Sequence, residues 1–121
     1  MSTPRTLEHP DVVELNLDAV LAALADPMRR RIVVQLAGGC EDQACIAFEL
    51  PVSRSTATHH FRVLRLAGII EQRYQGTAIL NSLRTTCLEE RFPGLLPAIV
   101  AADGRGRDAD AVAPGPVTPT P

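Results

Sequence analysis

The sequence predicts a mainly α-helical domain with one small β-hairpin, and three observations support this fold class. Apolar residues recur at helical spacing through most of residues 11–102. A short helix, a tight turn and a longer helix are expected between Gln43 and Ala67. After Gly68 the pattern changes to IIEQRYQGTAILNSL, whose alternating or continuous apolar residues are typical of two strands. Together these features predict a winged helix-turn-helix of about five helices with a two-stranded wing.

The first helix is expected soon after Pro10, with Asp11 and Asn16 as alternative N-caps. Apolar residues recur in it at helical spacing: Val13, Leu17, Val20, Leu21 and Leu24. This stripe is wide for a helix near a terminus, which favours a buried contact with a second copy of the chain. Ordinary packing in the core explains it equally well.

A second helix is predicted from Asp26-Pro27, because an acidic N-cap and a proline at the first helical position both favour a start there. Gly38-Gly39 end it, and its inward residues are Met28, Ile32, Val33 and Leu36. The first turn carries Arg29, Arg30 and Arg31, although the helix dipole disfavours cations there. We expect these arginines to pair with acidic residues of the first helix; alternatively, one reaches a DNA phosphate.

The most informative helix is predicted from about Arg54 to Ala67, between the N-cap Ser53 and the C′ residue Gly68. Its inward stripe consists of Ala57, Phe61 and Leu64, with His60 beside them. Its outward face has no acid and carries guanidinium, hydroxyl and imidazole groups: Arg54, Ser55, Thr58, His59 and Arg62. Solvated helix faces usually mix both signs of charge. This face therefore indicates a polyanion partner, and we predict that it reads double-stranded DNA.

The surrounding sequence agrees with a DNA partner. A short helix over about Gln43 to Leu50, stopped by Pro51, would brace against the DNA backbone while the longer helix enters the major groove. The net charge of the chain is -2, but between Ser53 and Arg84 arginines outnumber the single acid, Glu71.

The hairpin that follows is the predicted wing, with Gly76 supplying a positive φ at its turn. Polar residues near the tip are candidates for contacts with a phosphate or the minor groove: Arg73, Tyr74, Gln75 and Thr77. The alternative is a hairpin that only covers the core.

The last predicted elements are a turn of helix with a Thr86/Glu89 capping box and a helix from about Gly94 to Ala102. The apolar stripe of this last helix can pair with the first helix, within one chain or across a dimer. The predicted dimer interface is therefore Leu17, Val20, Leu21, Leu24, Leu95, Leu96, Ile99 and Val100.

Outside this domain of residues 11–102, we expect a loose arm at 1–10 and a disordered tail rich in Pro, Gly and Ala at 103–121. No apolar run approaches the ~20 residues that span a bilayer, so no membrane contact is expected. The N-terminus MSTPRTLEHP has no apolar run to act as a signal, and the 3 cysteines form no repeating pattern, so we expect a cytoplasmic protein.

Three pieces of sequence resemble the ArsR/SmtB family of winged-helix repressors: LADPMRRRIVVQL (Leu24 to Leu36), SRSTATHHFRVLRLAGII (Ser53 to Ile70) and the turn near Gly76. The resemblance covers about Val13 to Leu83. It implies a homodimer, held by the first and last helices, that sits on a partly palindromic operator and blocks transcription until an effector releases it.

The effector sites depart from this family pattern. Many members bind metal through paired cysteines before the recognition helix, or through Asp, His and Glu in the last helix. Here the cysteine positions fall near Asp42 and Ala44, and Leu95 to Ala102 contains none of these ligands. Only Cys40 and Cys45 remain as weak candidates for a transition metal or, with Cys87, for an oxidant-sensitive thiol; packing is the favoured role of Cys45.

No catalytic residues are predicted, because the sequence contains no nucleophile with a base and an orienting acid, no phosphate-binding glycine loop and no HExxH motif. An enzyme is therefore not expected. The two hypotheses are a homodimeric repressor and a DNA-binding or interaction subunit whose metal or ligand is sensed by a separate partner protein.

Overall fold

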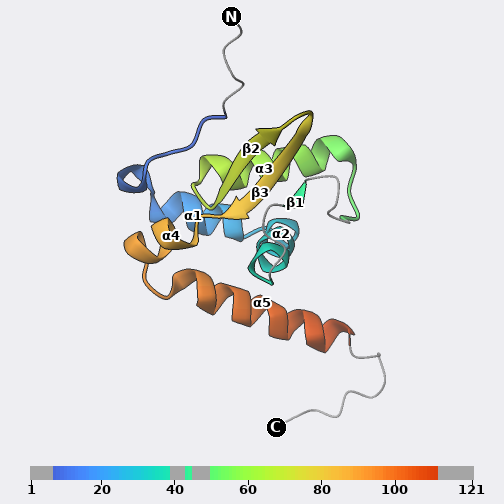
Figure 1. Cartoon of the computed structure of the whole chain (residues 1–121). Coiled ribbons are helices and arrows are strands. Elements are labelled where there is room, and N and C mark those ends of the chain that lie inside the picture. Colours follow the sequence, from blue (N-terminus) through green and yellow to red (C-terminus); the bar gives the residue numbers. More distant parts are fainter. Residues whose placement is uncertain (1–6, 39–42, 45–49, 112–121) are drawn as a thin grey trace, which may run out of the picture.

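The computed structural model describes residues 7–38, 43–44 and 50–111. Its elements are η1 (Val12–Glu14), α1 (Leu17–Leu24), α2 (Pro27–Ala37), β1 (Gln43–Ala44), α3 (Arg54–Leu66), β2 (Ile70–Gln75), β3 (Ala78–Leu83), α4 (Thr85–Arg91) and α5 (Leu95–Ala111). The strands form an antiparallel sheet in the order β1-β3-β2. In Figure 1, α1 and α2 lie between long α5 on one side and α3 with the β2–β3 hairpin on the other. The predicted class, helices with one hairpin, is confirmed.

The segment predicted as one first helix forms two short elements. Asp11 precedes η1, and its backbone N–H donates to Glu14 Oε1 at 2.7 Å. Asn16 caps α1 by accepting from the Ala19 N–H at 3.0 Å. Asp11 and Asn16 therefore each occupy the N-cap position of a separate helix. Val13 is 77% exposed, because the chain is extended between the two helices and the side chain that turns into the core is Leu15.

The start of α2 is formed as predicted. The Asp26 carboxylate accepts from the N–H groups of Met28 and Arg29 at 2.7 and 3.2 Å. Burial acts to raise the pKa of this carboxyl, but the two amide hydrogen bonds prevail and the pKa is lowered. Ile32, Val33 and Leu36 are buried, and Gly38 caps the end of the helix.

The expected pairing of the α2 arginines with acids of the first helix is wrong. Arg29 and Arg30 instead donate to the carbonyl oxygens of Ala22, Ala23 and Leu24 in the last turn of α1, and of these Ala22 also accepts from the Ala25 N–H. Arg30 also forms an ion pair with Asp103 of α5, with Nε and Oδ1 2.8 Å apart. The arginines thus hold helix ends and neighbouring helices together.

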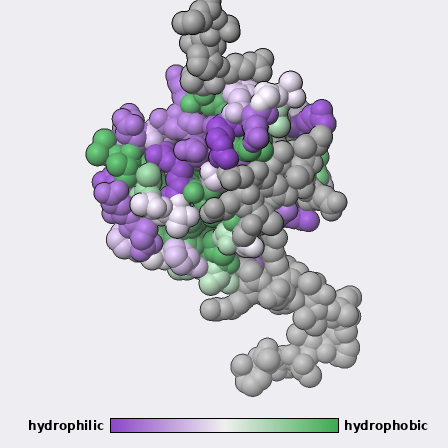
Figure 2. All heavy atoms as spheres, in the orientation of Figure 1, coloured by the Kyte–Doolittle hydropathy of each residue, from purple (hydrophilic) through white to green (hydrophobic). Residues whose placement is uncertain are grey.

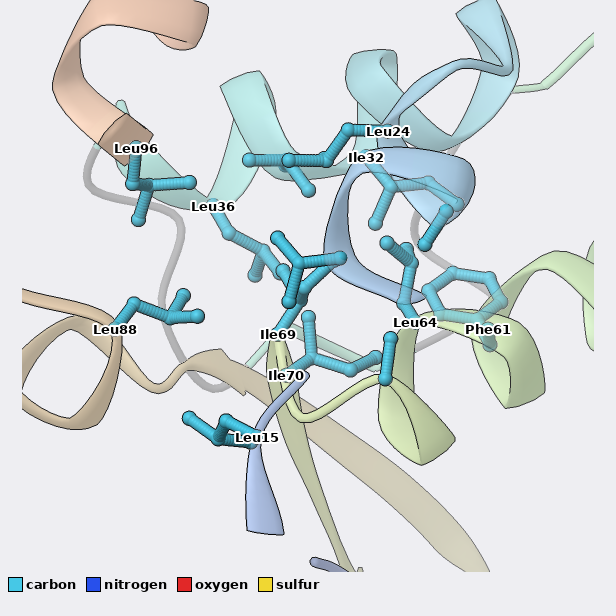
Figure 3. Close-up of a cluster of buried hydrophobic side chains, with 14 residues drawn as sticks. Leu15, Leu24, Ile32, Leu36, Phe61, Leu64, Ile69, Ile70, Leu88 and Leu96 are labelled. Carbon is cyan, nitrogen blue, oxygen red and sulfur yellow. The ribbon is translucent and has the colours of Figure 1, made fainter. Parts of the chain in front are cut away.

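One core joins the helices to the base of the hairpin. Figure 3 shows side chains from α1, α2, α3 and α5 converging on it, among them Leu24, Ile32, Leu64 and Leu96. Gly68 leads from α3 into β2 with a φ of 85°, and a Cβ at this position would collide with the Leu15 side chain. Glycine is required there by both the backbone conformation and the space.

Three predicted boundaries need correction. Gln43–Ala44, expected to begin a short helix, form β1 instead, because their backbone pairs with β3 at Asn81 and Leu80. Residues 45–49 of that predicted helix lie outside the described residues. Thr86 makes no capping box, since α4 begins at Thr85 with Arg84 in the N-cap position, and Glu89 accepts from the Gly94 N–H.

The terminal segments also differ from expectation. α5 runs to Ala111, so the tail predicted from residue 103 begins inside a helix. Pro97 does not interrupt it, because the first turn of a helix needs no amide hydrogen at that position. At the other end, Leu7–Pro10 of the predicted loose arm contact the sheet, with His9 bonded to β2.

The predicted dimer residues divide into three groups. Val20, Leu24 and Leu96 are buried in the core of the single chain, as the alternative interpretation of this stripe held. Leu95, Ile99 and Val100 are partly buried against that core. Leu17 and Leu21 are 45% and 44% exposed and remain available to a second chain. Within the described part of the chain, no helix combines the length and apolar character needed to cross a bilayer.

Candidate nucleic-acid interface

Helix α3 has the two faces that its sequence predicts. The Ser53 hydroxyl accepts from the Thr56 N–H at 3.2 Å and starts the helix at Arg54. His60, Phe61 and Leu64 are buried on the inner face. Every residue predicted to face outward is exposed: Arg54, Ser55, Thr58, His59 and Arg62. The orientation of the helix is therefore confirmed, while its contact with DNA stays a prediction.

The outward side chains of α3 are poorly engaged by the protein itself. Thr58 donates to the Arg54 carbonyl at 2.9 Å, and the Ser55 hydroxyl lies 3.3 Å from that of Ser53. Among the residues that the structure describes, none forms a hydrogen bond or ion pair with the guanidinium of Arg54 or Arg62. With no acid on this helix, both groups can meet an anionic partner without losing an internal contact.

The β2–β3 hairpin presents a second polar surface. Its strands pair from Ile70↔Leu83 to Gln75↔Ala78, which leaves a two-residue turn with Gly76 at a φ of 62°. Arg73, Gln75 and Thr77 are exposed, as predicted, and Tyr74 is half-buried. In Figure 1 the hairpin tip points away from α5, on the side of the molecule where α3 lies. Figure 2 shows mainly hydrophilic residues over the hairpin.

A buried polar cluster at the base of the wing was not predicted. Gln72 and Asn81 are cross-strand partners, 6% and 0% exposed, and Gln72 Nε2 donates to Asn81 Oδ1 at 2.8 Å. Arg65 of α3 donates from Nη1 to Gln72 Oε1 at 3.4 Å, which joins this pair to the helix. The detectable signal was the alternation of β2, which places Gln72 on the inward side with Ile70.

The N-terminal segment Leu7–Pro10 supports the same part of the sheet. The Gln72 N–H, on the edge strand β2, donates to His9 Nε2 at 2.9 Å, and Arg84 donates to the Pro10 carbonyl at 2.7 Å. Burial lowers the pKa of His9, and the charges of Arg65 and Arg84 add to this, against the opposing effects of Leu7 and Glu71. His9 is thus favoured in the neutral form that can accept this hydrogen bond.

Of the three cysteines proposed as metal or thiol candidates, the structure describes one. Cys40 and Cys45 lie outside the described residues. Cys87 is a half-buried free thiol whose Sγ lies 3.6 Å from Arg84 Nη2. The described side chains contain no group of three or more His, Cys, Asp or Glu residues that could hold a metal ion.

Comparisons with known proteins agree with this arrangement. The family model described as bacterial regulatory protein, arsR family, matches residues 26–72. The chain is 32% identical over 87 residues to the transcriptional repressor SdpR of Bacillus subtilis, which covers 72% of this chain and 97% of that protein. It is 32% identical over 81 residues to the HTH-type transcriptional regulator CmtR of Mycobacterium tuberculosis, covering 67% and 69%.

A solved structure supports the same relationship. The ArsR-like transcriptional regulator from Rhodococcus sp. RHA1 superposes with a TM-score of 0.54 and 29% sequence identity. The match covers 80% of this chain and 92% of that one. The similarity therefore extends well beyond the recognition helix and the hairpin.

Proposed function

The chain belongs to the ArsR family of winged helix-turn-helix, DNA-binding transcriptional regulators, and from this premise we propose that it is a homodimeric repressor of a partly palindromic operator. The observation that carries the proposal is the outward face of α3, which is exposed, bears arginines and has no acid. The similarity to a protein named as a transcriptional repressor supports the direction of regulation.

In this proposal α3 enters the major groove with its N-terminal half against the base edges. Arg54 and Arg62 bind guanine edges or phosphates, and Ser55, Thr58 and His59 complete the contact. Arg73, Gln75 and Thr77 of the wing bind the flanking backbone or minor groove. The exposure of all these side chains on α3 and the hairpin supports this assignment.

The dimer would be formed by α1 and α5. Leu17 and Leu21 expose apolar surface on α1, and Leu95, Ile99 and Val100 are only partly buried on α5. Covering such residues with a second chain removes apolar surface from water. Two copies of α3 would then read half-sites about one helical turn apart, roughly 34 Å, or a multiple of it.

The test of the DNA surface is the Arg54→Ala, Arg62→Ala variant. The probe is a duplex selected from genomic fragments that the wild type retains, titrated over a range of salt concentrations. A lost guanine contact should cost about 1–3 kcal/mol and relax preference at one base pair, whereas a lost phosphate contact should lower the salt slope by about one. Arg91→Ala, on α4, is the control for removing an arginine elsewhere on the surface; because it also removes a 2.8 Å hydrogen bond to the Leu15 carbonyl, its unfolding in urea is measured in parallel. Equal, salt-insensitive binding by the double variant and the wild type would contradict the proposal.

The test of the dimer is Leu17→Glu with Leu21→Glu. Because both side chains are nearly half exposed, the charges should leave the core of each chain intact while opposing association. Sedimentation should show a monomer with much weaker operator binding. A wild-type monomer at concentrations that saturate the operator would overturn the dimer.

A second candidate function is a DNA-binding subunit whose effector acts on a separate partner protein. It is favoured because Asp42 and Ala44 stand near the positions where the family resemblance implies a pair of metal-binding cysteines. Titration with zinc, nickel and arsenite should then leave the DNA affinity unchanged. Stoichiometric metal binding that is lost in a Cys40→Ser, Cys45→Ser variant would instead identify this chain as its own sensor.

A further inference from the structure

The arginines in the first turn of α2 have a role that the DNA surface does not use. Arg29 donates from Nε to the Ala23 carbonyl at 2.6 Å and from Nη2 to the Ala22 carbonyl at 3.4 Å. Arg30 donates to the Leu24 carbonyl at 2.8 Å. Carbonyls in the last turn of a helix carry the negative end of its dipole, and those of Ala23 and Leu24 have no backbone donor among the described residues, whereas Ala22 also accepts from the Ala25 N–H. The arginines therefore stabilise the end of α1, which explains their unfavourable place at the start of α2.

Arg29 also reaches the recognition helix. Its Nη1 lies 3.2 Å from Nδ1 of His60, which is 7% exposed on the inner face of α3. A guanidinium has only donors, so in a hydrogen bond between the two groups Nδ1 of His60 is the acceptor. The planar side chain of Arg29 thus joins the end of α1 to the middle of α3, while the backbone N–H of Arg29 donates to the Asp26 carboxylate.

The contact with His60 differs in kind from the rest of the inner face. Phe61 and Leu64 pack against the core through apolar contacts, which have no preferred direction and tolerate small rotations of the helix. A hydrogen bond to a rigid guanidinium fork is directional. Since successive residues on a helix point about 100° apart, holding His60 also determines where His59 and Arg62 point.

We propose that Arg29 is a positioning residue for DNA recognition, which through His60 sets the rotation of α3 about its axis and so directs its outward side chains into the groove. The inference rests on the proposed function of the outward face of α3. It predicts that Arg29 affects discrimination between DNA sequences more than binding to DNA in general, because phosphate contacts tolerate a rotation that base contacts do not.

The experiment compares Arg29→Lys, His60→Leu and His60→Asn. Lysine keeps the charge without the fork, leucine keeps apolar volume without an acceptor, and the asparagine amide oxygen can replace Nδ1 as acceptor. Each protein is titrated with the selected operator duplex and with poly(dI-dC) as non-specific DNA. Unfolding in urea reports stability in parallel.

Arg29→Lys and His60→Leu should each weaken operator binding about tenfold, a typical size for coupled neighbours, with little change on poly(dI-dC). The double variant should be no worse than either single one, and His60→Asn should bind almost as the wild type does. In the free protein, Arg29→Lys should shift the nitrogen resonance of His60 Nδ1. Parallel losses on both DNAs, additive losses in the double variant or no rescue by asparagine would overturn the proposal.

Two controls separate this inference from the proposed function. Arg31→Lys changes the same turn of α2 at a side chain with no hydrogen bond to the described residues, and it should leave both affinities unchanged. If Arg54→Ala, Arg62→Ala weakens operator binding while Arg29→Lys does not, only the positioning role fails. If Arg29→Lys weakens it while the Arg54, Arg62 pair does not, the proposed DNA surface and the positioning role fail together.

Discussion

The recognition helix and the wing present arginines on the same side of the molecule but are attached to it in different ways. Helix α3 is held mainly by apolar side chains, with Phe61 2% and Leu64 0% exposed. The base of the wing is held by Ile70, which is 0% exposed in the same core, and by the buried hydrogen-bonded pair Gln72 and Asn81. Apolar burial therefore stabilises both attachments, and the wing adds a buried polar contact whose value is geometric.

The benefit of the polar pair is a single strand register. Gln72 and Asn81 lie directly opposite each other, so their amides meet only in the observed pairing. A register slip by one residue would move the inward side chains of the strand to the opposite face of the sheet. A slip by two would leave both amides buried but no longer hydrogen-bonded to each other. Apolar contacts such as those of Leu64 do not discriminate in this way.

The largest effect is expected in the helix, from Leu64→Ala. Because Leu64 is fully buried, the cavity should lower the free energy of unfolding by about 2–5 kcal/mol. Leu66→Ala, at a 46% exposed position of the same helix, should cost less than about 0.5 kcal/mol. Urea denaturation of both variants measures the contrast. Equal costs would mean that α3 does not depend on its inner face.

A smaller effect with a different signature is expected in the wing. Asn81→Leu removes the acceptor of the buried Gln72 amide and should cost about 1–3 kcal/mol. Gln72→Leu combined with Asn81→Leu should recover much of this stability but weaken the specification of register, seen as faster amide exchange in β2 and β3. Strictly additive losses in the double variant, with unchanged exchange, would show that the pair has no geometric role.

A third prediction concerns the start of the recognition helix. Ser53→Ala removes the hydroxyl that accepts from the Thr56 N–H and should cost about 1 kcal/mol in unfolding free energy. Ser55→Ala, at the second residue of the helix, should be close to neutral. The comparison by urea denaturation isolates the cap, and a larger loss from Ser55→Ala would place the helix start elsewhere.

The smallest effect should come from the support of the wing by His9. Its pKa in the folded protein is lowered, chiefly by burial, from the ordinary value of 6.5. The unfolded chain therefore binds the proton more readily than the folded one. The contribution of His9 to folding stability is complete above pH 6.5 and is lost as the pH falls through the lowered pKa of the folded protein. Urea midpoints between about pH 7.5 and about pH 5 should fall less steeply for His9→Gln than for the wild type. If the urea midpoints of the two proteins fell equally with pH, His9 would not contribute to the pH dependence of stability.

Local signals in the sequence predicted the elements that form the candidate site. Asp26 and Ser53 cap the helices that they were expected to start, and Gly76 has the positive φ that its turn requires. Caps, turns and periodicity act between residues a few positions apart, so they can be detected without the fold. The predicted exposure of Arg54 and Arg62 follows from the same periodicity.

Features that join distant residues could not be predicted in this way. β1 exists because two residues meet the free edge of β3, and α5 continues past Ala102 into a segment whose composition indicated disorder. The helix dipole disfavours the first-turn arginines, which predicted that they had partners elsewhere, but the predicted acidic partners on the first helix were wrong. Sequence spacing does not reveal which helix end will lie beside a guanidinium.

The division of α3 into a buried and a polar face can be predicted from the amino-acid pattern alone, since the helical period runs through 13 consecutive residues and the cap Ser53 directly precedes them. The contacts that hold this helix and the wing follow from the folded chain alone: Arg29 meets His60, and Gln72 meets Asn81 and His9. The physical reason is that these hydrogen bonds require atoms from separate elements to meet at about 3 Å, and packing of the whole chain brings them together.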